Sequence, residues 1–144
     1  MKTYSFWANP TDMDSVPPYI LMGLVSMQRA LGDDFVLLTP QNVGDYVPQE
    51  HLQKAWAFTR QVPHLSPEIM RIIATSDFLR MYVVAERGGV WIDADTIVLR
   101  DYRAQIDAMA DDTLLWHSEQ FFCARQGNPI LSRIAGNMLR GGDL

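Results

Sequence analysis

Residues 76–101 read SDFLRMYVVAERGGVWIDADTIVLRD, and this stretch governs the interpretation of the rest of the chain. It predicts the end of a helix, a stop at a glycine pair, a short buried strand over residues 90–92 and a further apolar strand over residues 96–99. Two carboxylates, Asp93 and Asp95, lie between the two apolar runs. We therefore expect both carboxylates at the mouth of a hydrophobic sheet, where a charge needs a partner.

Asp93 and Asp95 are a candidate site for a divalent metal. Two oxygen ligands at the exit of a strand suit a hard cation such as Mg²⁺ or Mn²⁺ when water and the phosphates of a substrate supply the remaining ligands. The alternative is that the two aspartates cap a turn and pair with Arg87 or Arg100. Spacing alone leaves both interpretations open.

Asp77 and Arg80 are a second pair of charged residues in this stretch. They lie three positions apart in the predicted helix, so their side chains share one face and can pair. The simple interpretation is a surface ion pair, which contributes little to stability. A functional role is favoured by their position in an otherwise apolar helix that leads directly to Asp93 and Asp95.

The composition is that of an ordinary globular protein. The chain has 144 residues, of which 48% are hydrophobic and 20% charged, so we expect one domain over residues 1–144 with a real core. The net charge is −5 and the basic residues are scattered, which argues against a nucleic-acid partner bound by a basic face.

Cysteine usage and apolar runs give an expectation about location. Cys123 is the single cysteine, which excludes an intramolecular disulfide and a thiolate metal cluster and fits a reducing compartment. The apolar run over residues 16–27 is too short to span a bilayer, and the N-terminus lacks the apolar core of a signal peptide. We therefore expect a cytoplasmic protein without a transmembrane segment, and peripheral membrane contact stays open.

Strand and helix patterns alternate along the chain. The expected strands cover residues 3–8, 35–38, 90–92, 96–99, 113–116 and 120–124. The expected helices cover residues 17–31, 49–58, 67–87, 102–109 and 129–139. The apolar run over residues 35–38 predicts a strand buried on both faces, and the first 38 residues predict a βαβ unit. The alternation predicts an α/β layered fold with a mainly parallel central sheet.

The residues SDFLR at 76–80, followed by GGVWIDAD at 88–95, resemble the signature of glycosyltransferases with a DXD-containing sugar-binding region. That group includes capsular polysaccharide synthesis proteins, mannosyltransferase-like enzymes and, more distantly, the large glucosylating bacterial toxins. The interval of 16 residues from Asp77 to Asp93 makes the composite pattern more specific than a lone DXD.

The resemblance implies a GT-A (Rossmann-like) fold that binds a UDP- or GDP-sugar with Mn²⁺ or Mg²⁺. It also implies transfer of the sugar, with retention, to a hydroxyl of a glycan or another acceptor. Asp95 would hold the metal against the diphosphate, while Asp93 would contact ribose or sugar hydroxyls and the water shell of the metal. Asp77 and Arg80 would bind the hydroxyls of the donor sugar, and Trp7 would stack on the nucleobase. The implied catalytic residues are Asp77, Arg80 and Asp93.

Two alternatives concern how much of an enzyme this chain is. Members of the family are commonly longer, and their C-terminal part carries acceptor contacts, a further metal ligand and a closing lid. We therefore expect a C-terminally shortened, donor-binding portion of the fold. The alternative is a truncated or inactive module that binds a nucleotide-sugar and transfers nothing.

A third interpretation comes from another class of enzyme. Residues 90–97 also fit the first motif of haloacid-dehalogenase-like phosphohydrolases, in which the first aspartate is the nucleophile and the second a general acid/base. That family needs a downstream lysine, and this chain has no lysine after Lys54. Its motif also normally comes early, whereas 92 residues precede Asp93.

Overall fold

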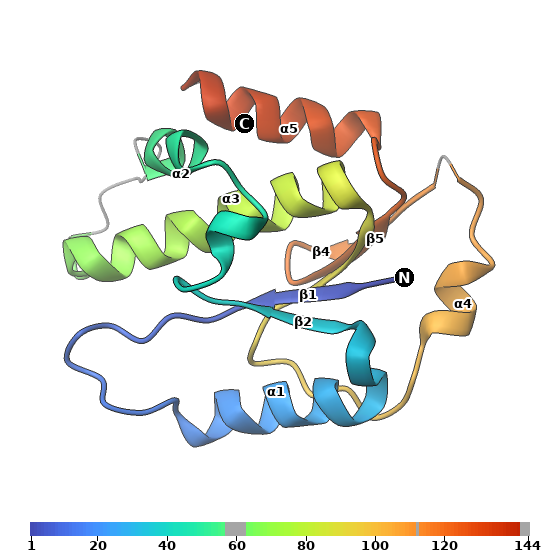
Figure 1. Cartoon of the computed structure of the whole chain (residues 1–144), viewed down its shortest axis with the longest axis horizontal. Coiled ribbons are helices and arrows are strands. Elements are labelled where there is room, and N and C mark those ends of the chain that lie inside the picture. Colours follow the sequence, from blue (N-terminus) through green and yellow to red (C-terminus); the bar gives the residue numbers. More distant parts are fainter. Residues whose placement is uncertain (57–62, 112, 142–144) are drawn as a thin grey trace.

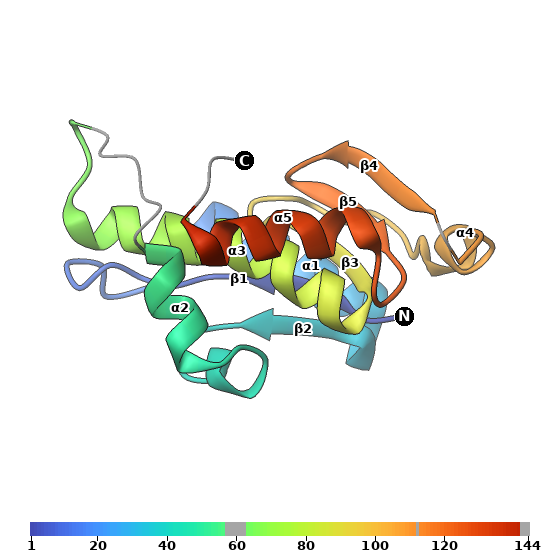
Figure 2. The ribbon, with the colours of Figure 1, turned by 90° about the horizontal axis from the view of Figure 1, so that it is seen from above.

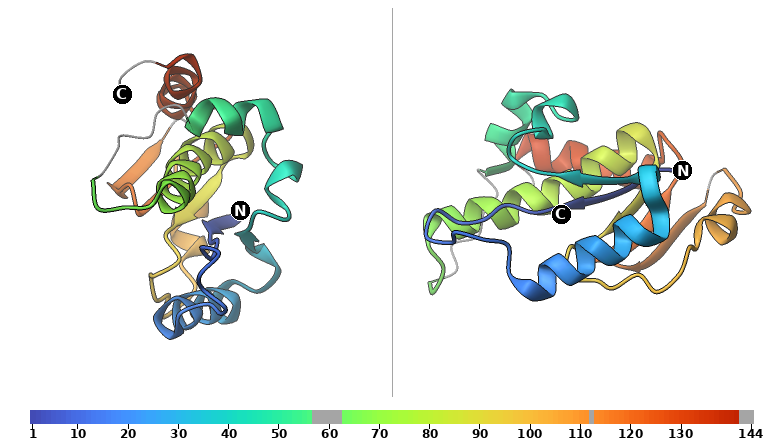
Figure 3. Two further views of the ribbon diagram at one scale, coloured as in Figure 1. Left: turned by 90° about the vertical axis from the view of Figure 1, so that its left-hand side faces the viewer. Right: turned by 60° about the horizontal axis from the view of Figure 1, so that its bottom comes forward.

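The computed structural model describes residues 1–56, 63–111 and 113–141 of the chain. In chain order its elements are β1 (Thr3–Phe6), α1 (Pro18–Leu31), η1 (Gly32–Asp34), β2 (Phe35–Leu38), η2 (Val43–Asp45), α2 (Gln49–Trp56), α3 (Pro67–Arg87), β3 (Gly89–Ile92), α4 (Arg103–Asp107), β4 (Leu114–Ser118), β5 (Phe121–Ala124) and α5 (Pro129–Arg140). The central sheet carries α1 on one face and α3 with α5 on the other (Figures 1 and 3). The expected α/β layered architecture is therefore confirmed.

The elements β1, α1 and β2 form the predicted βαβ unit. β1 and β2 pair in parallel, with Thr3 opposite Phe35 and Phe6 opposite Leu38. The strand order is β2-β1-β3-β5-β4, so β2 is an edge strand. The expectation that β2 is buried on both faces is wrong, because an edge strand is covered less completely than a central one. Only Leu38 is fully buried, and the other three residues are partly exposed.

The prediction of a mainly parallel sheet is wrong, because the sheet is mixed. β1 pairs in parallel with β2 and β3, whereas β5 runs antiparallel to both β3 and β4. β4 and β5 are consecutive strands joined by the two residues Glu119 and Gln120. Strands joined by so short a connection can pair only as an antiparallel hairpin.

Residues 96–99 do not form the predicted strand. β3, which precedes them, already has β1 on one side and β5 on the other, so the chain leaves the sheet. The segment runs along α1 instead, where the amide of Val98 donates a hydrogen bond of 2.8 Å to the Ser26 hydroxyl. An apolar run with strand composition thus becomes an irregular segment.

The long helix α3 begins and ends where the sequence predicts. The Ser66 hydroxyl accepts a hydrogen bond of 3.2 Å from the amide of Ile69, and Pro67 occupies the first turn. Gly88 ends the helix with φ of +66°, a conformation that favours glycine. α2 ends at Trp56, and residues 57–58 of the helix predicted there lie outside the described residues.

Alternate side chains of β3 enter two different cores. Trp91 packs with Phe78 and Phe122 on the face covered by α3 and α5, whereas Val90 and Ile92 pack on the opposite face with residues such as Met27 of α1. This alternation is the period of a strand whose two faces are both covered.

Figure 2 shows α5 alongside α3, and Cys123 of β5 is fully buried. Among the described residues, none of the helices combines the length and apolar character that crossing a membrane requires.

Gly23 lets α1 approach the loop that follows β3. A Cβ at this position would overlap the carbonyl oxygen of Ala94 and lie 2.9 Å from that of Thr96. Because both obstacles are backbone atoms, a side chain at position 23 would push the loop that carries Asp93 and Asp95 away from the helix. The conformation of this loop therefore depends on a residue about 70 positions earlier in the chain.

Gly23→Ala should lower the free energy of unfolding by about 2 kcal/mol, because overlap in a packed interface outweighs the gain in helix propensity. Gly136→Ala in α5 is the matched control, since its nearest neighbour is a flexible side-chain atom, Arg140 Nη1, at 3.3 Å. Urea unfolding of both variants checks the comparison. Equal or greater stability of Gly23→Ala relative to Gly136→Ala would show that the contact is loose.

Candidate functional site

The site lies where two parallel strands end. β1 and β3 are neighbours and run in the same direction, so the residues that follow them, Trp7 and Asp93, lie at the same edge of the sheet. A cavity of about 250 Å³ opens there. Its lining residues are Phe6, Trp7, Ala8, Tyr19, Ile20, Ile72, Ile73, Ser76, Asp93, Ala94 and Asp95.

Asp93 is held by hydrogen bonds to its side chain and to its backbone. The indole Nε1–H of Trp91 donates to Asp93 Oδ1 at 2.7 Å. The Asp93 amide donates to the carbonyl of Gln120, and the amide of Thr96 donates to the Asp93 carbonyl, both at 3.0 Å. The carboxylate, 21% exposed, is thus fixed in place with one oxygen oriented by a buried ring.

Arg80 joins Asp77 to Asp93. Its Nη2 lies 2.9 Å from Asp77 Oδ1 and 3.7 Å from Asp93 Oδ1, and its Nη1 donates to the carbonyl of Glu119 at 2.9 Å. The predicted pair between Asp77 and Arg80 is therefore present. It is not a surface pair, because Arg80 is only 8% exposed and its guanidinium carbon lies 5.9 Å from the centre of the Trp91 ring.

The electrostatic balance around Asp77 is negative. Burial raises the pKa of the Asp77 carboxyl, and the neighbouring Arg80 opposes this by lowering it. Asp93 and Glu119 raise the pKa further by repulsion. One guanidinium thus pairs with the carboxylates of Asp77 and Asp93, and the Glu119 carboxylate adds to an excess of negative charge near Asp77 when all three are ionised.

Asp95 is exposed and lines the cavity beside Asp93. Within residues 1–56, 63–111 and 113–141, neither aspartate forms an ion pair with Arg87 or Arg100. Arg87 instead donates to the carbonyl of Asp45 at 2.8 Å and lies over a tyrosine ring. Asp95 is therefore open to a ligand in the cavity.

A metal at this site would have two carboxylate ligands from the protein. Among the described residues, no three His, Cys, Asp or Glu side chains are grouped in a way that could hold an ion. Asp93 retains its second carboxylate oxygen, and both oxygens of Asp95 are open. Mg²⁺ commonly takes one or two carboxylates, with water and substrate phosphates completing its shell, so the donor set fits such an ion.

The structure brings Trp7 to the same cavity and adds residues that the sequence interpretation missed. Trp7 is half-buried, and its Nε1–H donates to Asn9 Oδ1 at 2.6 Å, which orients the ring. Tyr19 at the start of α1 also lines the cavity and is 61% exposed. The sequence could have predicted the contact of Trp91 with Asp93, because residues two apart on a strand share a face. No sequence pattern predicts that Tyr19 lines the cavity, because its position depends on how α1 packs.

The protein family described as "Glycosyltransferase sugar-binding region containing DXD motif" matches residues 33–118, which is more than half of the chain. The match includes Asp77, Arg80, Asp93 and Asp95, whereas Trp7 precedes it. Comparison with curated proteins and with solved structures found no match.

An NMR pH titration should place the pKa of Asp77 above its ordinary value of 3.8, while Asp101, which bonds Arg103, titrates at about 2 in the same experiment. Asp93→Asn should lower the pKa of Asp77, because it removes a repelling charge and keeps an oxygen that accepts from Trp91. Arg80→Gln should raise it. Between its ordinary and raised pKa values, Asp77 binds more protons in the folded protein, so its contribution to stability falls as pH rises through that window. An Asp77 pKa that neither variant moves would show that the three groups are electrostatically independent.

Proposed function

The chain belongs to the glycosyltransferases with a DXD-containing sugar-binding region, and we propose that it binds a nucleotide-sugar in the cavity at the ends of β1 and β3 and transfers the sugar to a hydroxyl acceptor. One observation carries the proposal: Trp7, Asp93 and Asp95 line a single cavity, although more than 80 residues separate the first from the others. An aromatic face and two carboxylates are what a nucleobase and a cation-bound diphosphate require.

The base would stack on Trp7. Stacking requires an aromatic ring that is partly accessible and held in place, and Trp7 is half-buried with its indole nitrogen bonded to Asn9. The cavity of about 250 Å³ is smaller than a typical small-molecule site, so it would enclose part of the donor and leave the rest along its rim.

Asp93 and Asp95 would hold Mn²⁺ or Mg²⁺ together with the diphosphate of the donor. When bound, the ion supplies a Lewis acid that neutralises charge on the leaving diphosphate. The protein's part is to fix the ligands in advance. Trp91 and Arg80 hold Asp93, and Gly23 lets α1 support the loop that carries both aspartates. Ligands fixed before binding need no reorganisation during the reaction.

Of the two residues expected to bind the hydroxyls of the donor sugar, Asp77 would do so directly and Arg80 would act through its aspartate partners. The Asp77 side chain is 50% exposed, so it can accept a hydrogen bond from a sugar hydroxyl while it keeps Arg80. Arg80 is almost fully buried, and its positive charge acts on the sugar mainly through the two aspartates that it touches. Retention at the anomeric carbon, and a role in capsular or other glycan synthesis, rest on the resemblance of residues 76–80 and 88–95 to that group.

The phosphohydrolase interpretation receives less support from the geometry. It requires a lysine beside the aspartate pair, and the basic group that the described residues place within 4.0 Å of Asp93 is Arg80. The matched family also favours transfer of a sugar over hydrolysis of a phosphate ester.

Asp95→Asn should raise the dissociation constant of UDP or GDP in the presence of Mn²⁺ by at least about tenfold, because it removes one of two anionic ligands. Without Mn²⁺ the variant and the unaltered chain should bind equally weakly. Asp111→Asn is the matched control, since the Asp111 side chain is fully exposed and lies outside the cavity. Calorimetric titration measures all three proteins, and metal-dependent binding that survives in Asp95→Asn would refute the metal role.

Trp7→Ala should weaken binding of a nucleoside monophosphate by about 1–3 kcal/mol, with or without metal, because base stacking has this size. Trp7→Phe keeps an aromatic face and should recover most of the loss. Calorimetry measures the unaltered chain and both variants. Equal losses in the two variants would show that Trp7 acts through packing and not through stacking.

A further inference from the structure

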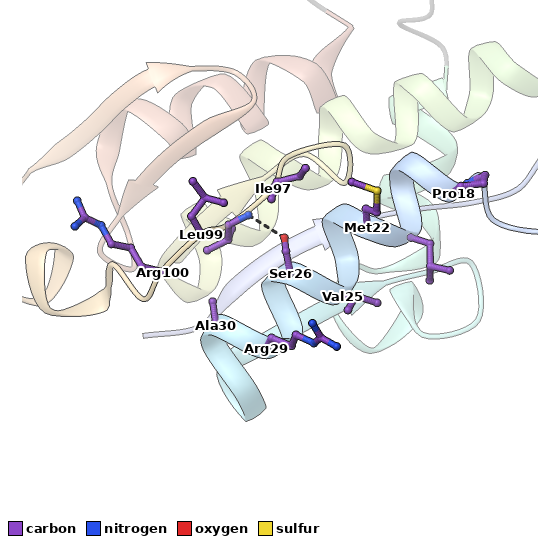
Figure 4. A pocket seen from close by; sticks show the side chains of 11 residues that line it. Pro18, Met22, Val25, Ser26, Arg29, Ala30, Ile97, Leu99 and Arg100 are labelled. Carbon is purple, nitrogen blue, oxygen red and sulfur yellow. Dashed lines mark hydrogen bonds between the residues drawn. The ribbon is translucent and has the colours of Figure 1, made fainter.

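A larger hollow lies on the α1 side of the protein, beyond the aspartate loop. It has a volume of about 770 Å³ and lies between the outer face of α1 and residues 97–100 (Figure 4). Leu21, Met22 and Val25 line one side, and Ile97 and Leu99 line the other. Leu99 is 91% exposed, which is far more than packing in a closed core would leave.

Exposed apolar side chains concentrate on this face. Among the described residues, ten large hydrophobic side chains are exposed, and six of them lie on α1 or in residues 97–99. The six are Tyr19, Leu21, Met22, Val25, Ile97 and Leu99. All of these except Tyr19, which lines the aspartate cavity, line the hollow, and an exposed apolar patch of this kind marks an interaction surface.

Two arginines line the hollow, and the other polar side chain in its lining, Ser26, is already hydrogen-bonded. Arg29 and Arg100 line it, no acidic residue does, and neither arginine forms an ion pair with a described residue. The Ser26 hydroxyl donates to the carbonyl of Gly23 and accepts from the amide of Val98. Figure 4 shows this second bond within the hollow, with the two arginine side chains directed away from it. The surface therefore offers hydrocarbon and two cations, and no other free hydrogen-bonding side chain.

We propose that this face docks on an anionic membrane surface. The centre of this face is made of hydrocarbon side chains, which suit acyl chains because neither needs hydrogen bonds. Arginine pairs well with lipid phosphates. The face thus pairs hydrocarbon with hydrocarbon and guanidinium with phosphate.

The net charge of −5 does not oppose this contact. Fixed charges are screened beyond about 8 Å at physiological ionic strength, so the charges at the contact itself dominate. Nearby Asp101 is engaged with Arg103 at 2.6 Å, which reduces its repulsion of lipid phosphates. The proposal rests on this face alone and is independent of the proposed glycosyltransferase activity.

Sedimentation of the unaltered chain with vesicles tests the proposal. We expect binding to phosphatidylcholine vesicles that contain about one third phosphatidylglycerol, weaker binding to pure phosphatidylcholine, and loss of the difference at high salt. Replacing both arginines (Arg29→Gln with Arg100→Gln) should weaken binding to the anionic vesicles by about thirtyfold. Leu99→Asp should weaken it by about tenfold, because it places a charge where an apolar side chain enters the bilayer.

Ile130→Asp is the matched control, since Ile130 is 53% exposed and lies on α5, on the other side of the sheet. It should bind vesicles as the unaltered chain does, and thermal unfolding verifies that each variant is folded. Failure of the unaltered chain to sediment with anionic vesicles would overturn the proposal, as would an equal loss in Ile130→Asp. A concentration-dependent dimer that Leu99→Asp abolishes, without vesicle binding, would assign the face to a second copy of the chain instead.

Discussion

The structure around the site depends on the neutralisation of one buried cation. Arg80 is only 8% exposed, and an uncompensated charge at that depth costs several kcal/mol. Its partners come from three different parts of the chain: Asp77 from α3, Asp93 from the end of β3, and the carbonyl of Glu119 from the turn between β4 and β5. The need to satisfy this guanidinium therefore fixes the positions of a helix, a strand and a hairpin relative to one another.

Trp91 links this network to the core. Its ring is fully buried between β3 and α3, and its one polar atom donates to Asp93 at the surface of the cavity. A buried indole needs such a partner, and a carboxylate near a low-dielectric core needs a donor. One bond meets both needs, so the packing of the interior and the orientation of the site's first aspartate cannot change independently.

Local patterns predicted the elements, and long-range pairing decided the rest. The helix over residues 67–87, its stop at the glycine pair and the strand over residues 35–38 each depend on a few neighbouring residues. All three form as predicted, although the strand is not buried on both faces. Residues 96–99 have the same composition as a strand, yet β1 and β5 already flank β3, a fact that no local pattern contains. The mixed sheet also results from long-range pairing, because β5 pairs with β3, which lies about 30 residues earlier in the chain. The aspartate pair was recognisable from sequence, whereas the contribution of Tyr19 and the support from Gly23 depend on the packing of α1.

The excess of negative charge in the site bears on how it could hold a diphosphate. Asp93 and Glu119 lie close enough to Asp77 to raise the pKa of its carboxyl, and Asp95 adds a further carboxylate to the cavity. Such a surface repels a bare diphosphate and attracts a divalent cation. In the proposed function a cation would be held by Asp93 and Asp95, and its charge would offset this excess. This charge balance supports the proposal that an anionic ligand binds together with a metal, as the DXD sequence of the matched family would imply.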